Sequence, residues 1–182
     1  FEHIRKQIKE IIEIKKVNQN YLFTLYNLCV IHYRRHKDTN NMNKYLLEMY
    51  NMAPTDYQSI YAIKLLMNVF FTLKQYSNVI TWSDIAIPII KKLQNNQNIL
   101  VKCIYFDTAL AYRYLKENNS CIEILQFLLK NYSFPVGEKI DINLIKIDIL
   151  EEKGDYTLAE NMLKEMYIQA KGIDDKYRYV LV

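Results

Sequence analysis

The chain has 182 residues, of which 51% are apolar, with only three glycines and three prolines. This length is enough to bury a substantial core, and the scarcity of turn-forming residues argues against a fold built from β-hairpins. The net charge of +4 arises from 24 basic and 20 acidic residues of mixed order, which indicates a solvated surface and argues against a basic arm for nucleic acid.

The first predicted element is an amphipathic helix at 2–16, whose isoleucines recur with the 3.6-residue period of a helix. Eight further helices are predicted from the same periodicity and from the short polar segments that separate them. Their ranges are 19–35, 40–51, 56–74, 77–93, 97–117, 120–131, 138–153 and 156–171. Connections this short place neighbouring helices in antiparallel pairs. Pro88 lies inside one helix, and we expect it to bend that helix near Asp84 without ending it.

A repeated pattern groups these helices into hairpins. The segment EEKGDYTLAENMLKEM (151–166) aligns with segments at 113–128, 71–86 and, more weakly, 34–49, and successive copies are 37, 42 and 38 residues apart. In each copy a helix ends, a polar turn follows, and two apolar residues recur seven positions apart on the next helix. Seven residues are two helical turns, so both residues face the same neighbouring helix. The pairs are Met42/Met49, Val79/Ala86, Cys121/Leu128 and Ala159/Met166.

The turn between the two helices of a hairpin also has a recurring chemistry. Gly154 is predicted to end one helix with a positive φ, a conformation that glycine adopts at little steric cost. Asp155 is then predicted to cap the next helix. An aromatic residue at the turn, Tyr76 or Tyr156, is predicted to wedge between the two helices.

These features resemble the tetratricopeptide repeat, a helix-turn-helix unit with a Gly-x-x-Tyr turn, small residues on its second helix and a proline soon afterwards. The turns LKQY and KGDY carry the resemblance, together with the small residues that follow them and with Pro54 and Pro135. Asn118 and Thr39 depart from it, because they stand where tyrosine is usual. The resemblance implies an all-α fold of about nine helices, a right-handed superhelix forming a single domain over 1–182. Its hairpins would be 19–51, 56–93, 97–131 and 138–171, and the helix at 2–16 would belong to a preceding hairpin.

The stretched spacing resembles that of the peptide-pheromone receptors of Gram-positive bacteria, the PlcR and Rgg group of transcriptional regulators. The similarity to the PlcR type runs through DYQSIYAIKLLMNVFFTLKQY and the 42-residue step to VKCIYFDTALAYRYLKEN. It implies that the repeats form a homodimer and hold a short signalling peptide, and that DNA is bound only through a helix-turn-helix domain that this chain does not contain. The chain would then be the sensor half of a cytoplasmic regulator.

In a solenoid of helical hairpins, the first helix of each pair lines the concave face, which binds extended ligands. An asparagine amide can satisfy both the donor and the acceptor of a peptide unit, Lys64 or Arg34 can bind a terminal carboxylate, and aromatic residues supply pockets for apolar side chains. The resemblance places Asn27, Asn68 and Asp107 near the family's peptide-backbone contacts, although an aspartate departs from the pattern. The candidate peptide-binding residues are Asn27, Arg34, Tyr61, Lys64, Asn68, Phe71, Phe106, Asp107, Arg113 and Tyr114. The alternative is that these residues form only the solvated side of amphipathic helices.

The sequence HYRRH sets His32 and His36 one helical turn apart, a spacing that can hold zinc. Two arginines and the lack of a third ligand argue against a metal there, and a phosphate contact would need a second basic helix. No phosphate-binding glycine loop or nucleophile motif is present, so the sequence predicts no enzyme, cofactor or metal. Cys29, Cys103 and Cys121 lie among apolar residues and are predicted to be reduced, buried thiols.

The leading hypothesis is therefore a peptide-binding sensor domain of a quorum-sensing regulator. The rival hypothesis is a helical-repeat scaffold that binds a protein partner and controls no transcription. No apolar run approaches the roughly 18 residues that span a bilayer, so no membrane segment is predicted.

Overall fold

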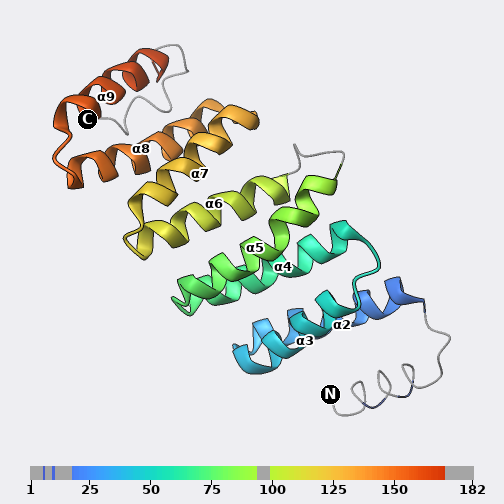
Figure 1. Cartoon of the computed structure of the whole chain (residues 1–182). Coiled ribbons are helices and arrows are strands. Elements are labelled where there is room, and N and C mark those ends of the chain that lie inside the picture. The colour runs from blue at the N-terminus through green and yellow to red at the C-terminus, as the bar shows by residue number, and fades with distance from the viewer. Residues whose placement is uncertain (1–5, 7–9, 11–17, 94–98, 171–182) are drawn as a thin grey trace.

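The computed structural model describes residues 6, 10, 18–93 and 99–170, and these are helical except at the turns between helices (Figure 1). The predicted helix at 2–16 lies outside the described residues apart from Lys6 and Glu10. The described helices are α2 (Gln19–Arg35), α3 (Thr39–Asn51), α4 (Asp56–Thr72), α5 (Tyr76–Lys92), α6 (Ile99–Tyr114), α7 (Asn118–Asn131), α8 (Val136–Glu152) and α9 (Tyr156–Ala170).

The prediction of an all-α repeat of antiparallel hairpins is confirmed. The pairs α2/α3, α4/α5, α6/α7 and α8/α9 pack as hairpins, and each hairpin stacks on the next, as Figure 1 shows. The first helices α4 and α6 also contact each other directly. Helix α5 continues through Pro88, so this proline does not end the helix. None of the described helices is both long and apolar enough to cross a membrane.

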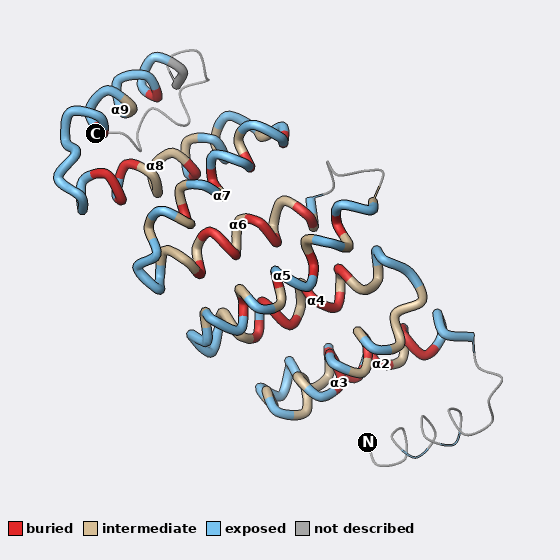
Figure 2. The backbone as a smooth tube through the Cα atoms, in the orientation of Figure 1, coloured by how far each residue is buried: buried red, intermediate tan, exposed pale blue. Residues whose placement is uncertain are grey.

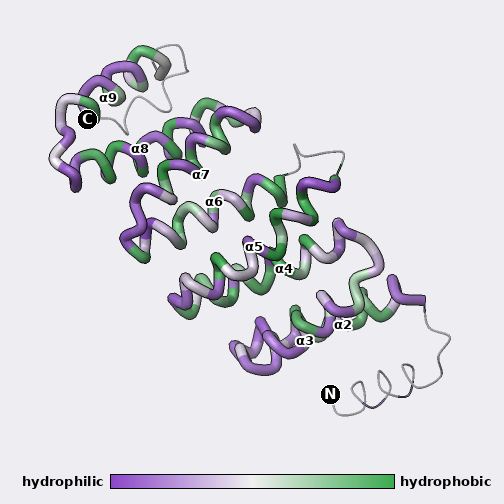
Figure 3. The backbone as a smooth tube through the Cα atoms, in the orientation of Figure 1, coloured by the Kyte–Doolittle hydropathy of each residue, from purple (hydrophilic) through white to green (hydrophobic). Residues whose placement is uncertain are grey.

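The core lies between helices of neighbouring hairpins rather than in one central mass. Figure 2 shows buried residues on the sides where helices face one another, and Figure 3 shows apolar and polar residues alternating along each helix. The residues predicted to pack at seven-residue spacing are buried, with one exception, because Met42 is only half-buried. The fully or nearly fully buried members are Met49, Val79, Ala86, Cys121, Leu128, Ala159 and Met166.

Each hairpin turn has the same hydrogen-bonding pattern. At Gly154, with φ +80°, the amide donates to the Glu151 carbonyl at 3.0 Å, and the following amide donates to the Leu150 carbonyl at 2.9 Å. This pair of bonds is the Schellman motif, which satisfies carbonyls at the end of a helix. The positive φ predicted for Gly154 is therefore confirmed. The hydrogen bonds described for Asp155 are made by its main chain, so the structure shows no side-chain cap there.

The other three turns use a lysine where the fourth uses glycine. Lys37, Lys74 and Lys116 have φ values of 55°, 58° and 64°, and their amides close the same pair of bonds. These three residues and Gly154 are 37, 42 and 38 positions apart, which is the repeat spacing found in the sequence. The repeat register is thus visible in the backbone itself.

The turn aromatics do not all act as predicted. Tyr76 is half-buried, lies edge-on to Phe71 at 5.3 Å and stacks on Tyr114 at 4.6 Å between ring centroids. Tyr156 is 68% exposed, so the predicted wedge is wrong at this position. The partner that stacks on Tyr76 comes from the first helix of the next hairpin, and no described hairpin follows α9.

Candidate functional site

A cavity of about 490 Å³ opens between the first hairpin and α4. Four of the predicted residues line it: Asn27 and Arg34 come from α2, and Tyr61 and Asn68 come from α4. Buried apolar side chains form part of its wall, among them Val30 and Leu46. The cavity therefore combines an apolar wall with amide groups on both sides, which is the usual composition of a ligand pocket.

This first cavity has a positive rim. Arg34 and Lys37 both line it, both are exposed, and no acidic residue is among its lining residues. Neither cation has an ion-pair partner within the part of the chain that the structure describes. Arg34 also lies in the last turn of α2, where the helix dipole favours a cation. A ligand here would be attracted through a negative group.

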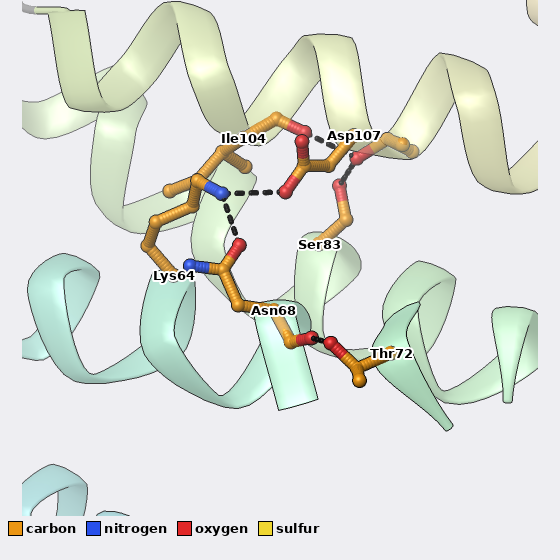
Figure 4. A network of polar contacts seen from close by, with 7 residues as sticks. Lys64, Asn68, Thr72, Ser83, Ile104 and Asp107 are labelled. Atoms are coloured by element: carbon orange, nitrogen blue, oxygen red, sulfur yellow. Dashed lines mark hydrogen bonds and ion pairs between the residues drawn. The ribbon is translucent and has the colours of Figure 1, made fainter. Parts of the chain in front are cut away.

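Lys64 joins two first helices instead of facing the ligand alone. Its ammonium group donates to Asp107 Oδ2 of α6 at 2.6 Å and also to Asn68 Oδ1 on its own helix (Figure 4). The side chains of Lys64 and Asp107 are only 14% and 19% exposed, so water screens this ion pair weakly. Lys64 is therefore already bound to two oxygens, and Arg34 is the better candidate for a ligand carboxylate.

A hydroxyl pair that the sequence analysis missed lies near this ion pair. Thr108 Oγ1 is 2.7 Å from Ser83 Oγ of α5 and 2.7 Å from the Ile104 carbonyl oxygen, as Figure 4 shows. Both side chains are buried. Thr108 satisfies both contacts when it donates to the carbonyl and accepts the Ser83 proton. No local motif identifies such a pair, because its two members are 25 residues apart and meet only when α5 packs on α6.

A second cavity, of about 230 Å³, lies between α6 and α8. The predicted residues Phe106 and Asp107 line it, together with Glu138 and Asp141 of α8. Its one lysine, Lys102, donates to the Ser133 carbonyl and lies 4.9 Å from the centre of the Phe134 ring. This cavity is therefore acidic, in contrast to the first.

The cysteines are unpaired, as predicted, but one is less buried than expected. Cys29 and Cys121 are buried, whereas Cys103 is half-buried and lines the second cavity. Burial raises the pKa of Cys103 and raises that of Cys121 to about 11. Both thiols are therefore protonated at neutral pH and weakly nucleophilic.

The remaining predicted site residues take part in contacts between hairpins. Phe71 and Tyr114 pack with each other at 5.6 Å between centroids. Arg113 makes a bidentate pair with Glu152 of α8, with N–O distances of 2.6 and 2.5 Å. The hydrogen bonds from Arg113 lower the pKa of Glu152 to about 2. These three predicted residues hold the stack together and do not line either cavity.

The histidines of HYRRH lie close together, with ring centroids of His32 and His36 4.3 Å apart. Within the described ranges, no group of three or more His, Cys, Asp or Glu residues could hold a metal ion. The two rings instead pack at the end of α2, and the neighbouring positive charge of His36 adds to desolvation in lowering the pKa of His32.

Comparison with known proteins identifies a similar fold but no family. No family model matches the sequence, and no curated protein matches it. A solved structure, the crystal structure of BtubC (BKLC) from P. vanneervenii, matches with a TM-score of 0.71. The match covers 95% of this chain and 74% of that chain at 13% sequence identity. At this identity the similarity shows the helical-repeat fold alone.

Proposed function

We propose that this chain is the peptide-binding sensor domain of a transcriptional regulator similar to the PlcR and Rgg group. The observation that carries the proposal is the first cavity, where Asn27 and Asn68 face a common space from two helices beside Arg34 and Tyr61. An extended peptide leaves its backbone amides without strand partners, and asparagine side chains supply both a donor and an acceptor. The volume of about 490 Å³ lies within the range of small-ligand pockets.

The same residues give a route from binding to regulation. Asn68 lines the cavity and also accepts a hydrogen bond from Lys64, which pairs with Asp107 on the next hairpin. A peptide that binds Asn68 competes with this bond and so favours one arrangement of α4 against α6. A ligand with different affinities for two arrangements shifts their populations, which is what allosteric control requires. In the full regulator, a cytoplasmic homodimer, this shift would act on an attached DNA-binding domain.

Calorimetric titration tests the proposal with synthetic versions of the short hydrophobic peptides encoded beside the gene. We expect one of them to bind, and we expect Asn68→Ala and Asn27→Ala each to weaken binding about tenfold, because each removes a hydrogen bond to a desolvated peptide unit. Asn161→Ala is the matched control, since Asn161 is exposed on α9 and lines neither cavity. The proposal is wrong if no peptide binds, or if all three variants bind like the parent.

The rival function is a scaffold that binds a protein partner. It is favoured by α9, where Leu158, Tyr167 and Ile168 are 52%, 54% and 70% exposed, since such apolar surface in a soluble domain marks contact sites. The two functions differ in their effect on DNA. Peptide-dependent change in promoter binding by the full-length protein supports the regulator, and promoter binding that no peptide alters supports the scaffold.

A further inference from the structure

The two cavities of the first-helix face have opposite charge. The first is lined by Arg34 and Lys37 and by no acid. In the second, Lys64 neutralises Asp107, while Glu138 and Asp141 have no ion-pair partner among the described residues. The single lysine there, Lys102, is directed to a backbone carbonyl and an aromatic ring. One cavity is suited to an anion and the other to a cation.

The cavities are joined by a continuous strip of polar side chains. Asn68 lines the first cavity and Asp107 lines the second, and Lys64 bonds to both (Figure 4). The strip therefore crosses the stack from α2 to α8 over the first helices. A ligand that occupied both cavities would pass over these three side chains.

The separation of the cavities sets the length of such a ligand. The first cavity lies between α2 and α4 and the second between α6 and α8, so their centres are two helix spacings apart. With about 8–10 Å between packed helices, the centres are separated by roughly 16–20 Å across the stack. An extended chain rises about 3.3 Å per residue, so about six residues span this distance.

We infer that the groove binds an extended peptide of about six residues in one direction, with its terminal carboxylate in the first cavity and its terminal ammonium group in the second. The inference rests on the proposed peptide-binding function and adds polarity and length to it. Charge complementarity fixes the direction, because the reverse orientation would place the carboxylate beside Glu138 and Asp141 and the ammonium group beside Arg34 and Lys37. The apolar lining of both cavities favours apolar side chains next to the two ends.

The experiment uses a synthetic pool of hexapeptides of mixed sequence, prepared with free ends. The bound fraction is recovered with the protein and identified by mass spectrometry. The peptide that binds best is then synthesised with free ends, with an amidated carboxyl end and with an acetylated amino end, and each form is titrated by calorimetry. We expect either modification to weaken binding about tenfold, because it removes one charge-assisted contact.

Substitutions in the cavities assign each end. In Arg34→Gln the free-acid and amidated forms should bind within about twofold of each other, while the penalty for acetylation persists. In Asp141→Asn the penalty for acetylation should disappear and the penalty for amidation persist. Lys37→Gln and Glu138→Gln give independent second variants. Arg35→Gln and Asp148→Asn are the matched controls, since they lie on the same helices outside the cavities.

The outcomes separate the inference from the proposed function. If no member of the pool binds, both fail. If peptides bind and neither modification matters, peptide binding stands and the inference fails. If Arg34→Gln abolishes the acetylation penalty instead of the amidation penalty, the peptide runs in the opposite direction and the inference is overturned. If octapeptides and tetrapeptides bind as tightly as hexapeptides, the length is wrong.

Discussion

At the scale of single residues, four equivalent turn positions differ only in side chain. Lys37, Lys74 and Lys116 have the left-handed backbone that Gly154 also has. A residue with a β-carbon pays roughly 1 kcal/mol or more for this conformation. The chain therefore carries a strain of local origin in three turns and avoids it in the fourth.

Substitutions at these turns have opposite expected effects. We expect Gly154→Ala to lower the free energy of unfolding by about 1 kcal/mol, solely through the backbone, since a β-carbon there would meet no atom within 4 Å. Lys74→Gly should raise it by up to about 0.5 kcal/mol, because relief of strain is partly offset by backbone entropy. Urea denaturation measures both. Lys74→Ala is the control, and a gain in stability there would show that loss of the lysine charge, not the backbone, is responsible.

The ion pair of Lys64 and Asp107 gives a second prediction at this scale. Lys64→Met should destabilise the fold by about 2 kcal/mol, because it leaves a largely buried carboxylate without its partner. The double variant Lys64→Met/Asp107→Leu should recover most of this loss, since neither charge then remains buried. Thermal unfolding of the three proteins tests the prediction. Equal stability of single and double variants would mean that the pair is not coupled.

At the scale of helices, the link between α6 and α8 depends on pH. The hydrogen bonds from Arg113 hold the pKa of Glu152 at about 2, below its ordinary value of 4.5. A carboxyl group whose pKa is lowered by folding stabilises the folded state above its unfolded pKa and loses this contribution as the pH falls. Glu152 therefore contributes fully above pH 4.5 and progressively less toward pH 2.

The prediction is a difference between two pH profiles. The free energy of unfolding of the parent should fall between pH 4.5 and pH 2 more steeply than that of Glu152→Gln, which cannot titrate at this position. Guanidinium denaturation at several pH values measures both profiles. Glu151→Gln is a suitable control, because Glu151 is an exposed neighbour with no ion pair among the described residues. Parallel profiles for the parent and Glu152→Gln would contradict the prediction.

Helix positions were largely predictable from the sequence, but the roles of several side chains were not. The apolar period of each helix is local, so the eight described helices begin and end within three residues of their predicted ends where those ends are described. Phe71, Arg113 and Tyr114 were assigned to the site because they lie on first helices. Their actual partners, such as Tyr76 and Glu152, come from other elements. Which polar residue is consumed by a contact between hairpins cannot be read from local periodicity.

At the scale of the whole molecule, stability is uneven along the stack. One large buried cluster extends from α4 to α8 and another from α2 to α5, whereas the cluster at α8 and α9 has few buried members. In a repeat protein each unit is stabilised mainly by its neighbours. Helix α9 is therefore expected to open locally more often than the central helices.

Hydrogen exchange measured by mass spectrometry tests this expectation. Amides of α9 should exchange fastest among the described helices, and those of α4 and α6 slowest. Met166→Ala should speed exchange in α9 and leave α4 unchanged, because Met166 belongs to the small cluster. Leu125→Ala should lower protection in α6 and α7, since its side chain is fully buried in the large cluster. Uniform exchange along the chain would show that the stack unfolds as one unit.

The turn lysines also make the repeat readable by a protease. Trypsin cleaves after lysine, and Lys37, Lys74 and Lys116 are all exposed at equivalent points of successive hairpins. Cuts at these points release the segments 38–74 and 75–116, and each contains the second helix of one hairpin with the first helix of the next. Digestion would thus divide every hairpin at its turn while keeping the contact between neighbouring hairpins within one fragment. Those fragments would show whether the seam between repeats can hold two helices together without their own hairpin partners.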